Sequence, residues 1–351
     1  MTHSTPPTRA TLGEFGLISR ITAGVFTPAN VITGIGDDAA VTQLTPGMQL
    51  LTSTDMLLED VHFRRTWQDP YTLGRKSLAV SISDIAAMGG IPRWALLSIA
   101  IPSDLTLDFV DDFMRGFLTM ASENNVALIG GDTCSSRSGL TISVTIMGEQ
   151  LPERILRRSG AHPDDDIWVT GSLGDAALGL SLAEADDLDS PHPAGSQESE
   201  AEERDFFISR LLNPEPRVSV ALALSENGLA TAMIDISDGV LADFGHIAEQ
   251  STVGGCIQLD DLPLSDAFRA HAAALPAILY HLALSGGEDY ELCFTARCSN
   301  REKIKECVKK CGIEATRIGI VASSPGVTAI NSDGSLFNLQ KAGFNHFGNN
   351  Q

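Results

Sequence analysis

The sequence predicts a two-domain α/β (α+β) fold from its length, its alternating patterns and a break near its middle. The chain has 351 residues, and globular domains usually hold roughly 100–200 residues each. Short apolar runs typical of strands alternate with helical patterns along the chain. Because this alternation starts again after Gln150, we place one α/β domain at residues 1–150 and a second at residues 151–351.

The first domain combines strand and helix patterns that are bounded by Gly, Pro, Asp or Asn. Its expected strands are Leu50–Thr54, Trp94–Ile101, Val126–Ile129 and Leu140–Met147, and its expected helices are Arg75–Met88 and Leu107–Ser122. The second helix places Phe113 and Phe117 on one apolar face. Its first turn is rich in Asp, whose negative charge stabilises a helix N-terminus.

The second domain repeats this alternation around an acidic insert. Its expected strands are Ile167–Thr170, Ala232–Ile236, Tyr290–Thr295, Arg317–Val321 and Val327–Ile330, and its expected helices are Ala176–Ala185, one after Pro216, Val240–Glu249 and the Lys-rich run REKIKECVKKCG. The insert, residues 186–205, carries eight acids against one Arg and has no aromatic or β-branched residue. That composition predicts a solvated loop or a disordered segment, and we assign it no function.

The net charge excludes several classes of partner. Forty-five Asp and Glu face 24 Lys and Arg, giving −21, of which the acidic insert supplies −7, a third of the total. Such an excess of acid argues against non-specific binding to DNA, RNA or an anionic membrane surface.

The sequence also indicates the compartment. We find no apolar run of signal-peptide length at the N-terminus and nowhere 18 consecutive apolar residues, so we expect a cytoplasmic protein with reduced thiols. The last four of its six cysteines are spaced C-x4-C and C-x3-C, which does not match a zinc site. Cys307 and Cys311 share the apolar side of the Lys-rich helix, which favours a place in the core.

Six acidic clusters lie beside glycine or small hydroxyl residues, at the ends of apolar runs or within them. They are Gly36-Asp37-Asp38, Ser53-Thr54-Asp55, Ser83-Asp84, Gly130-Gly131-Asp132, Asp235-Ile236-Ser237-Asp238-Gly239 and Gly286-Gly287-Glu288-Asp289. A single Gly-Asp is a common turn signal, but six such clusters indicate a shared role. Asp84 is the most informative, because it lies inside the helical run SLAVSISDIAAMGG, where an unpaired carboxylate is costly.

Oxygen ligands beside glycine turns are typical of sites for hard cations and phosphate. Mg²⁺ is usually held by one or two carboxylates together with substrate phosphates, and glycine turns expose backbone N–H groups to anions. The common alternatives fail, since the chain has no EF-hand register, no P-loop, no complete dinucleotide fingerprint and no protein-kinase motif. The sequence therefore predicts a phosphate substrate that binds together with divalent metal.

The same clusters fall within segments that identify a family. In chain order these segments are GEFGLISRI (13–21), GIGDDAAV (34–41), STDMLLEDVHF (53–63), KSLAVSISDIAAMGG (76–90), LIGGDT (128–133), RSGAHPDDDIWVTGSLGD (158–175), IDISDGVLADFGHI (234–247) and LSGGEDYELCF (284–294). Together they resemble the thiamine-monophosphate kinase family, of the superfamily that includes aminoimidazole ribonucleotide synthetase. The resemblance implies ATP-dependent phosphorylation of thiamine phosphate to thiamine diphosphate, the last step in making that compound. It also implies several Mg²⁺ ions and a homodimer in which the N-terminal sheets of two copies pair.

The resemblance assigns roles by motif position, residue by residue. The implied Mg²⁺ ligands are Asp38, Ser53, Thr54, Asp55, Asp84, Asp132, Asp235 and Asp238, with Asp37 a weaker candidate. The implied ATP contacts are Gly131, Asp132, Arg158 and Ser237, and the implied thiamine phosphate contacts are His62, Glu288 and Phe344. We expect no general base, because the acceptor phosphate, with a second pKa of about 6, is largely a dianion at neutral pH.

Other functions compete with this one. Related ATP-dependent members of the superfamily include selenophosphate synthetase, which carries a reactive Cys or selenocysteine near its N-terminus, and the hydrogenase-maturation dehydratase, which ends in a Cys-bearing tail. Here no Cys precedes Cys134 and the chain ends FNHFGNNQ, so both are disfavoured. A non-catalytic, metal-dependent nucleotide or thiamine-phosphate binding protein stays open from the sequence, and turnover would separate it from a kinase.

Overall fold

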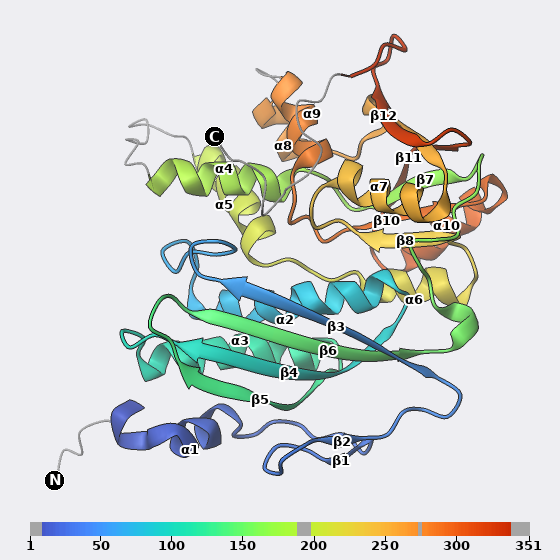
Figure 1. The fold of residues 1–351 in the computed structure, drawn as a ribbon. Coiled ribbons are helices and arrows are strands. Elements are labelled where there is room, and N and C mark those ends of the chain that lie inside the picture. Colours follow the sequence, from blue (N-terminus) through green and yellow to red (C-terminus); the bar gives the residue numbers. More distant parts are fainter. Residues whose placement is uncertain (1–8, 188–197, 273–275, 338–351) are drawn as a thin grey trace. The chain divides into compact units, whose positions relative to one another are not determined.

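The computed structural model describes residues 9–187, 198–272 and 276–337. Contacts divide the chain into two compact units. The first comprises Met1–Ile85 and Ile91–Pro152, and the second comprises Ala86–Gly90 and Glu153–Gln351. Both units combine helices with a β-sheet (Figure 1).

The first unit is a four-stranded sheet with helices on one face. Its elements are α1 (Arg9–Ile21), β1 (Val31–Thr33), β2 (Val41–Thr42), β3 (Gln49–Leu58), α2 (Pro70–Ala87), β4 (Ile91–Ile101), α3 (Leu107–Glu123), β5 (Ala127–Ser135) and β6 (Thr141–Gln150). The strand order is β3-β6-β4-β5, with β4 and β5 parallel and the other pairs antiparallel, while β1 and β2 form a separate antiparallel pair. In Figure 1, α2 and α3 lie together against the sheet.

Two glycines let α2 and α3 pack closely. A Cβ at Gly74 would lie 2.0 Å from the carbonyl oxygen of Phe113, and a Cβ at Gly116 would lie 1.8 Å from that of Tyr71. No larger residue fits at either contact, so the helices meet backbone to backbone. Phe113 and Phe117 are fully buried on α3, as its apolar pattern predicts.

The second unit is a six-stranded mixed sheet. Its elements are β7 (Asp166–Thr170), α4 (Asp175–Asp187), α5 (Glu198–Leu212), α6 (Val218–Glu226), β8 (Ala232–Asp235), α7 (Val240–Ser251), β9 (Gly254–Gln258), α8 (Asp266–Ala272), α9 (Pro276–Ser285), β10 (Leu292–Ala296), α10 (Arg301–Lys310), β11 (Ala315–Ala322) and β12 (Gly326–Ile330), with short 3-10 turns at Pro152–Arg154, Leu259–Asp261 and Cys298–Asn300. The strand order is β12-β9-β11-β7-β10-β8, with only β12 and β9 parallel.

Both faces of this sheet are covered. Successive side chains of strand β7 point to opposite faces of the sheet. Ile167 packs in one core with Phe244 of α7, whereas Trp168 packs in the other core, where its ring stacks on Phe294 with 6.2 Å between the ring centroids. Cys307 and Cys311 pack against that second core, as the sequence predicts.

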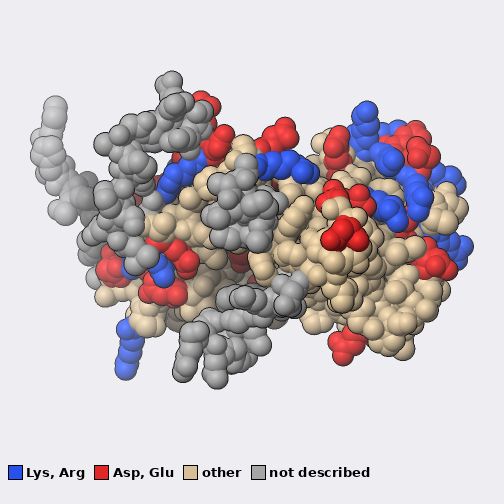
Figure 2. Space-filling view, turned by 90° about the horizontal axis from the view of Figure 1, so that it is seen from above, with Lys and Arg blue, Asp and Glu red and all other residues tan. Residues whose placement is uncertain are grey.

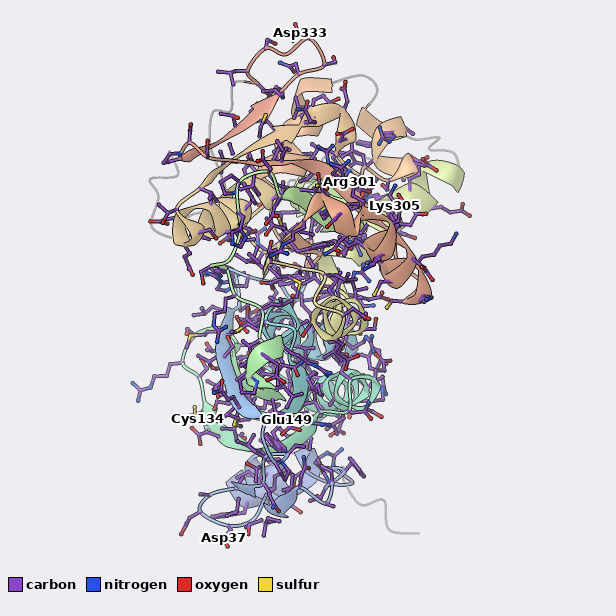
Figure 3. The ribbon with its side chains drawn as sticks, turned by 90° about the vertical axis from the view of Figure 1, so that its right-hand side faces the viewer. Asp37, Cys134, Glu149, Arg301, Lys305 and Asp333 are labelled. Carbon is purple, nitrogen blue, oxygen red and sulfur yellow. The ribbon has the colours of Figure 1, made fainter. Side chains whose placement is uncertain are left out.

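Ion pairs fasten α10 to the sheet beneath it. The fully buried carboxylate of Asp166 accepts two hydrogen bonds from Arg301, at 2.6 and 2.7 Å, and one from Arg317 at 2.6 Å. Figure 3 shows Arg301 and Lys305 on this helix, and Figure 2 shows Lys and Arg gathered at one end of the face it draws. The two Arg residues hold the pKa of Asp166 below its ordinary value despite its burial.

Two expectations from the sequence are wrong. Residues 198–205 of the acidic insert are not a loop but the first turns of α5. Glu, Ala and Arg favour helix, and the side chains of Phe207 and Leu211 on the later turns of this helix are buried. Gly130-Gly131-Asp132 and Ser53-Thr54-Asp55 are not at strand ends, since β5 and β3 continue through them. Residues 188–197 lie outside the described residues.

Within the described ranges, no helix is both long enough and apolar enough to cross a membrane.

Candidate functional site

Strand β3 and helix α2 bring two carboxylates of the first unit together. Side chains alternate along β3, so Ser53 and Asp55 share the face that α2 covers. The Ser53 hydroxyl donates a hydrogen bond to Asp84, and the Ser81 hydroxyl donates to Oδ2 of Asp55 at 2.6 Å. The result is a part-buried set of oxygen atoms from four side chains of two rigid elements.

This set carries excess negative charge. Burial and then the nearby Asp84 raise the pKa of Asp55, which the Ser81 hydrogen bond only partly opposes, so that the pKa is about 6. Two acids placed together repel each other when both are ionised, and a bound cation relieves that repulsion. The all-oxygen composition fits Mg²⁺, which prefers carboxylate and other oxygen ligands.

The structure does not bring every predicted metal ligand to this pair. The Thr54 hydroxyl belongs to the opposite, exposed face of β3, where it donates to the carbonyl of Val144 at 3.2 Å. Asp38 lies in an exposed loop, where its amide donates to Asp37 at 2.8 Å, and Figure 3 shows Asp37 beyond the edge of the first unit's sheet. In the described part of the chain, no three His, Cys, Asp or Glu side chains form a group that could hold a metal ion.

Gly131 and Asp132 lie on β5, along the parallel pairing with β4. Asp132 is opposite Ser98 and is exposed. A Cβ on Gly131 would lie 1.8 Å from the carbonyl oxygen of Leu97, so the strands approach here more closely than any side chain permits. This contact explains why the strand requires glycine at this position.

We therefore expect Gly131→Ala to lower the free energy of unfolding by about 1–3 kcal/mol, through overpacking against β4. The matched control is Gly130→Ala, whose Cβ would meet only the flexible Leu96 side chain, at 3.1 Å. Urea unfolding of both variants checks this. An equal loss in the free energy of unfolding of the two variants would contradict a role for the close contact between Gly131 and β4.

The ring of His62 is held by its own turn. The amide of Leu58 donates to Nδ1 at 3.0 Å, and the amide of His62 donates to the carbonyl of Leu58 at 2.9 Å. Because Nδ1 accepts, the neutral ring carries its proton on Nε2. That nitrogen is then a donor suited to a phosphate oxygen.

In the second unit, backbone hydrogen bonds join two predicted site turns. The amide of Ile236 donates to the carbonyl of Glu291 at 2.8 Å, that of Tyr290 donates to Ile236 at 2.8 Å, and that of Glu288 donates to Ser237 at 2.9 Å. Asp235, at the end of β8, and Glu288 are therefore parts of one framework. Glu288 and Tyr290 have φ of 70° and 49°, conformations that non-glycine residues adopt at a cost and that cluster at functional sites.

Asp243, on the first turns of α7, is a functional candidate that the sequence analysis missed. Its Oδ2 accepts hydrogen bonds from the amides of Ser237 and Asp238, both at 3.1 Å. Burial, together with the neighbouring Asp235 and Asp238, raises its pKa to about 8 even though the two amide hydrogen bonds lower it. A carboxylate within the apolar run VLADFGHI is the same signal that singled out Asp84, so the sequence could have revealed it.

A buried charge network supports these turns. Glu291 has no exposed surface and binds the guanidinium of Arg217 with both oxygens, Arg210 at 3.0 Å and the hydroxyl of Thr170 at 2.7 Å. Burial alone raises the pKa of Glu291, but the two Arg residues outweigh it and hold that pKa below its ordinary value. Next to it, the buried Asp289 accepts the amide of Gly174 at 3.0 Å.

Two other predicted residues have less support. The side chain of Arg158 is exposed, and its carbonyl accepts a hydrogen bond from Ser251 at 3.1 Å. Phe344 lies outside the described residues.

Known proteins match the chain in sequence and in structure. The family model for AIR synthase related protein, N-terminal domain, matches residues 36–150, and the model for the C-terminal domain of the same family matches residues 162–331. The thiamine-monophosphate kinase of Bacillus subtilis is 38% identical over 338 residues, which cover 96% of this chain and 100% of that protein.

Two solved structures share the fold. Thiamine-monophosphate kinase from Stenotrophomonas maltophilia is 38% identical, with a TM-score of 0.80 over 93% of this chain and 98% of that one. The structure named AaThiL complexed with AMPPCP and TMP is 32% identical, with a TM-score of 0.73 over 99% of this chain and 100% of that one. These matches confirm the resemblance and the two-domain α/β fold expected from the sequence, and the chain belongs to the thiamine-monophosphate kinase family of the AIR synthase related proteins.

Proposed function

We propose that this chain transfers the γ-phosphoryl group of ATP to thiamine phosphate, giving thiamine diphosphate and ADP. A phosphate oxygen of the acceptor forms a bond to the γ-phosphorus as the bond from that phosphorus to the β,γ-bridging oxygen breaks. Full-length identity of 38% to a kinase of this name supports the reaction, and the AMPPCP and TMP named for a solved relative match the expected pair of substrates.

The observation that carries the proposal is the pair Asp55 and Asp84, with the hydroxyls of Ser53 and Ser81 beside it. This negative pair, on a strand and a helix, suits a reaction that must unite two polyanions around divalent metal. Bound Mg²⁺ would neutralise the phosphates and stabilise the charge that develops during transfer. We propose that several Mg²⁺ ions are held in all, with Asp38, Ser53, Thr54, Asp55, Asp84, Asp132, Asp235 and Asp238 as their ligands, of which Asp38 and Thr54 do not belong to this pair.

The chain's own residues then bind and orient the two substrates. We assign ATP contacts to Gly131, Asp132, Arg158 and Ser237, and thiamine phosphate contacts to His62, Glu288 and Phe344. His62 can donate from Nε2 to the acceptor phosphate, and the Glu288 carboxylate attracts the cationic thiazolium ring. No residue acts as a base, since the acceptor is already largely deprotonated at neutral pH. The proposal includes a homodimer in the cytoplasm, with residues 1–150 as the domain that supplies most metal ligands.

A coupled assay of ADP release tests this function. We expect ADP only when Mg²⁺, ATP and thiamine phosphate are all present. Unphosphorylated thiamine is the matched control, because it lacks the attacking phosphate oxygen. Equal ADP release with thiamine, or without any acceptor, would contradict the proposal.

The stability of the metal-free protein should depend on pH through Asp55. Its pKa is raised from 3.8 to about 6 on folding, so the folded state binds this proton more tightly than the unfolded chain does. The resulting stabilisation is complete below pH about 4 and is lost as pH rises through about 6. Above that pH the carboxylate is free to hold Mg²⁺.

We therefore expect Mg²⁺ to raise the melting temperature more at pH 7.5 than at pH 5. Differential scanning calorimetry of the metal-free and Mg²⁺-loaded protein at both pH values checks this, with Asp55→Asn as the control that should respond less to Mg²⁺ at pH 7.5. An equal response of wild type at both pH values would contradict the role of this carboxylate.

A further inference from the structure

The turn that follows β8 is held by a side chain that comes after it in the chain. Asp243 is 2% exposed. A single oxygen, Oδ2, accepts the amides of Ser237 and Asp238, both at 3.1 Å. These two amides precede α7, whose N-cap residue is Gly239. Since backbone amides within a folded chain need an acceptor, Asp243 supplies one acceptor for both of them.

The shape of the turn makes this acceptor necessary. Gly239 has φ of 106°, and a Cβ there would lie 2.7 Å from the backbone carbon of Ser285. The chain therefore reverses direction tightly against α9. On the other side, the carbonyl of Ser237 accepts the amide of Glu288 at 2.9 Å. Asp243 thus binds the N–H of the Ser237–Asp238 peptide, and the carbonyl of the same peptide binds the amide of Glu288, the proposed thiamine phosphate contact.

We propose that Asp243 is a positioning residue for phosphoryl transfer, which orients Ser237 and Asp238 toward nucleotide and metal without binding either itself. This inference rests on the proposed function, because it takes the roles of Ser237 and Asp238 from it. The same buried oxygen serves both amides, so loss of one acceptor releases two residues of the site at once. Side chains that orient metal ligands typically change affinity or activity by about 10- to 100-fold when removed.

Two substitutions separate positioning from direct metal binding. Asp243→Asn keeps an oxygen that can accept both amides but removes the charge, whereas Asp243→Ala removes the acceptor. A positioning residue tolerates Asn and not Ala, while a metal ligand tolerates neither. We expect Asp243→Ala to lower kcat/KM about 10- to 100-fold and to raise the Mg²⁺ concentration needed for half-maximal activity, and Asp243→Asn to stay within about fivefold of wild type.

The matched control is Asp165→Ala. Asp165 is also buried, at 4% exposure, and accepts the amide of His162 at 3.0 Å and the hydroxyl of Thr231 at 2.8 Å. Thr231 precedes β8, at the opposite end of that strand from the turn. This variant loses a similar buried acceptor, so it reports the effect of lost stability alone. Activity is compared at a temperature at which circular dichroism shows every variant folded.

The outcomes are distinct. Asp243→Ala with wild-type kcat/KM and Mg²⁺ dependence, or with the same deficit as Asp165→Ala, would overturn the inference. If Asp243→Asn and Asp243→Ala were equally inactive, the inference would also be overturned, in favour of direct metal binding by Asp243. Failure of the proposed function is seen separately, as a wild-type protein that makes no thiamine diphosphate. In that case calorimetric titration of all variants with AMPPCP and Mg²⁺ still tests whether Asp243 orients a nucleotide site, with weaker binding by the Ala variant expected.

Discussion

Asp84→Asn should lower kcat at least about 1000-fold while the protein stays folded, because several kcal/mol of charge stabilisation depend on the metal that this carboxylate helps to hold. An Asn at this position keeps an oxygen that can accept the hydroxyl of Ser53. It also removes one of two acids whose proximity raises the pKa of Asp55. The metal-free variant should therefore melt at or above the wild-type temperature, since repulsion at the site is relieved.

Steady-state kinetics over a range of Mg²⁺ concentrations, together with thermal melting, measure both parts of this expectation. Asp55→Asn should behave in the same way. The control is Asp104→Asn, which removes an acid that is 60% exposed and pairs with Arg65 at 2.9 Å on the surface of the same unit. Near-wild-type turnover of Asp84→Asn would refute the metal assignment.

Arg217→Met should be the most destabilising substitution in the second unit, costing about 3–5 kcal/mol. Arg217 is the bidentate partner of Glu291, and these side chains are 9% and 0% exposed. Its removal leaves a buried carboxylate that, within the described residues, keeps Arg210 as its ion-pair partner. Because Glu291 also bonds through its backbone to the turn at Ile236, the damage should spread toward the site.

Urea unfolding of three variants tests this charge network. The double variant Arg217→Met with Glu291→Gln should recover part of the loss, since no unpaired charge stays buried. Arg154→Met is the control, because its pair with Glu226 spans 3.6 Å between side chains that are 39% and 52% exposed, and such surface pairs contribute little. A loss in Arg217→Met no larger than in the control would contradict the account.

The sequence predicted the fold class and the main metal candidates for identifiable physical reasons. Periodic apolar patterns located the helix around Asp84 and the strand of Trp168, because burial on one or both faces requires those periods. The unusual cost of an acid inside an apolar helix drew attention to Asp84, whose role as a metal ligand stays a prediction. The structure adds its neighbours Ser53 and Asp55, which come from a strand much earlier in the chain, Ser53 lying 31 residues before Asp84.

Other features depended on contacts that local sequence does not encode. Gly130-Gly131-Asp132 has the composition of a turn, yet it lies in β5, where Gly131 is needed because the backbone of β4 leaves no room for a side chain. The Glu-rich part of the insert forms α5 because its later apolar residues are buried by the second unit. The pairing of Glu291 with Arg217 joins residues 74 positions apart, and only tertiary structure shows that it is buried.

The most direct test of the central claim is phosphorus NMR of the purified protein with ATP, Mg²⁺ and thiamine phosphate, run beside metal-free and acceptor-free controls. The account predicts metal-dependent appearance of thiamine diphosphate, with one ADP formed per product. ADP and inorganic phosphate without thiamine diphosphate would show that the acceptor is wrong. Bound ATP with no turnover at all would contradict the assignment of a kinase and favour a binding protein.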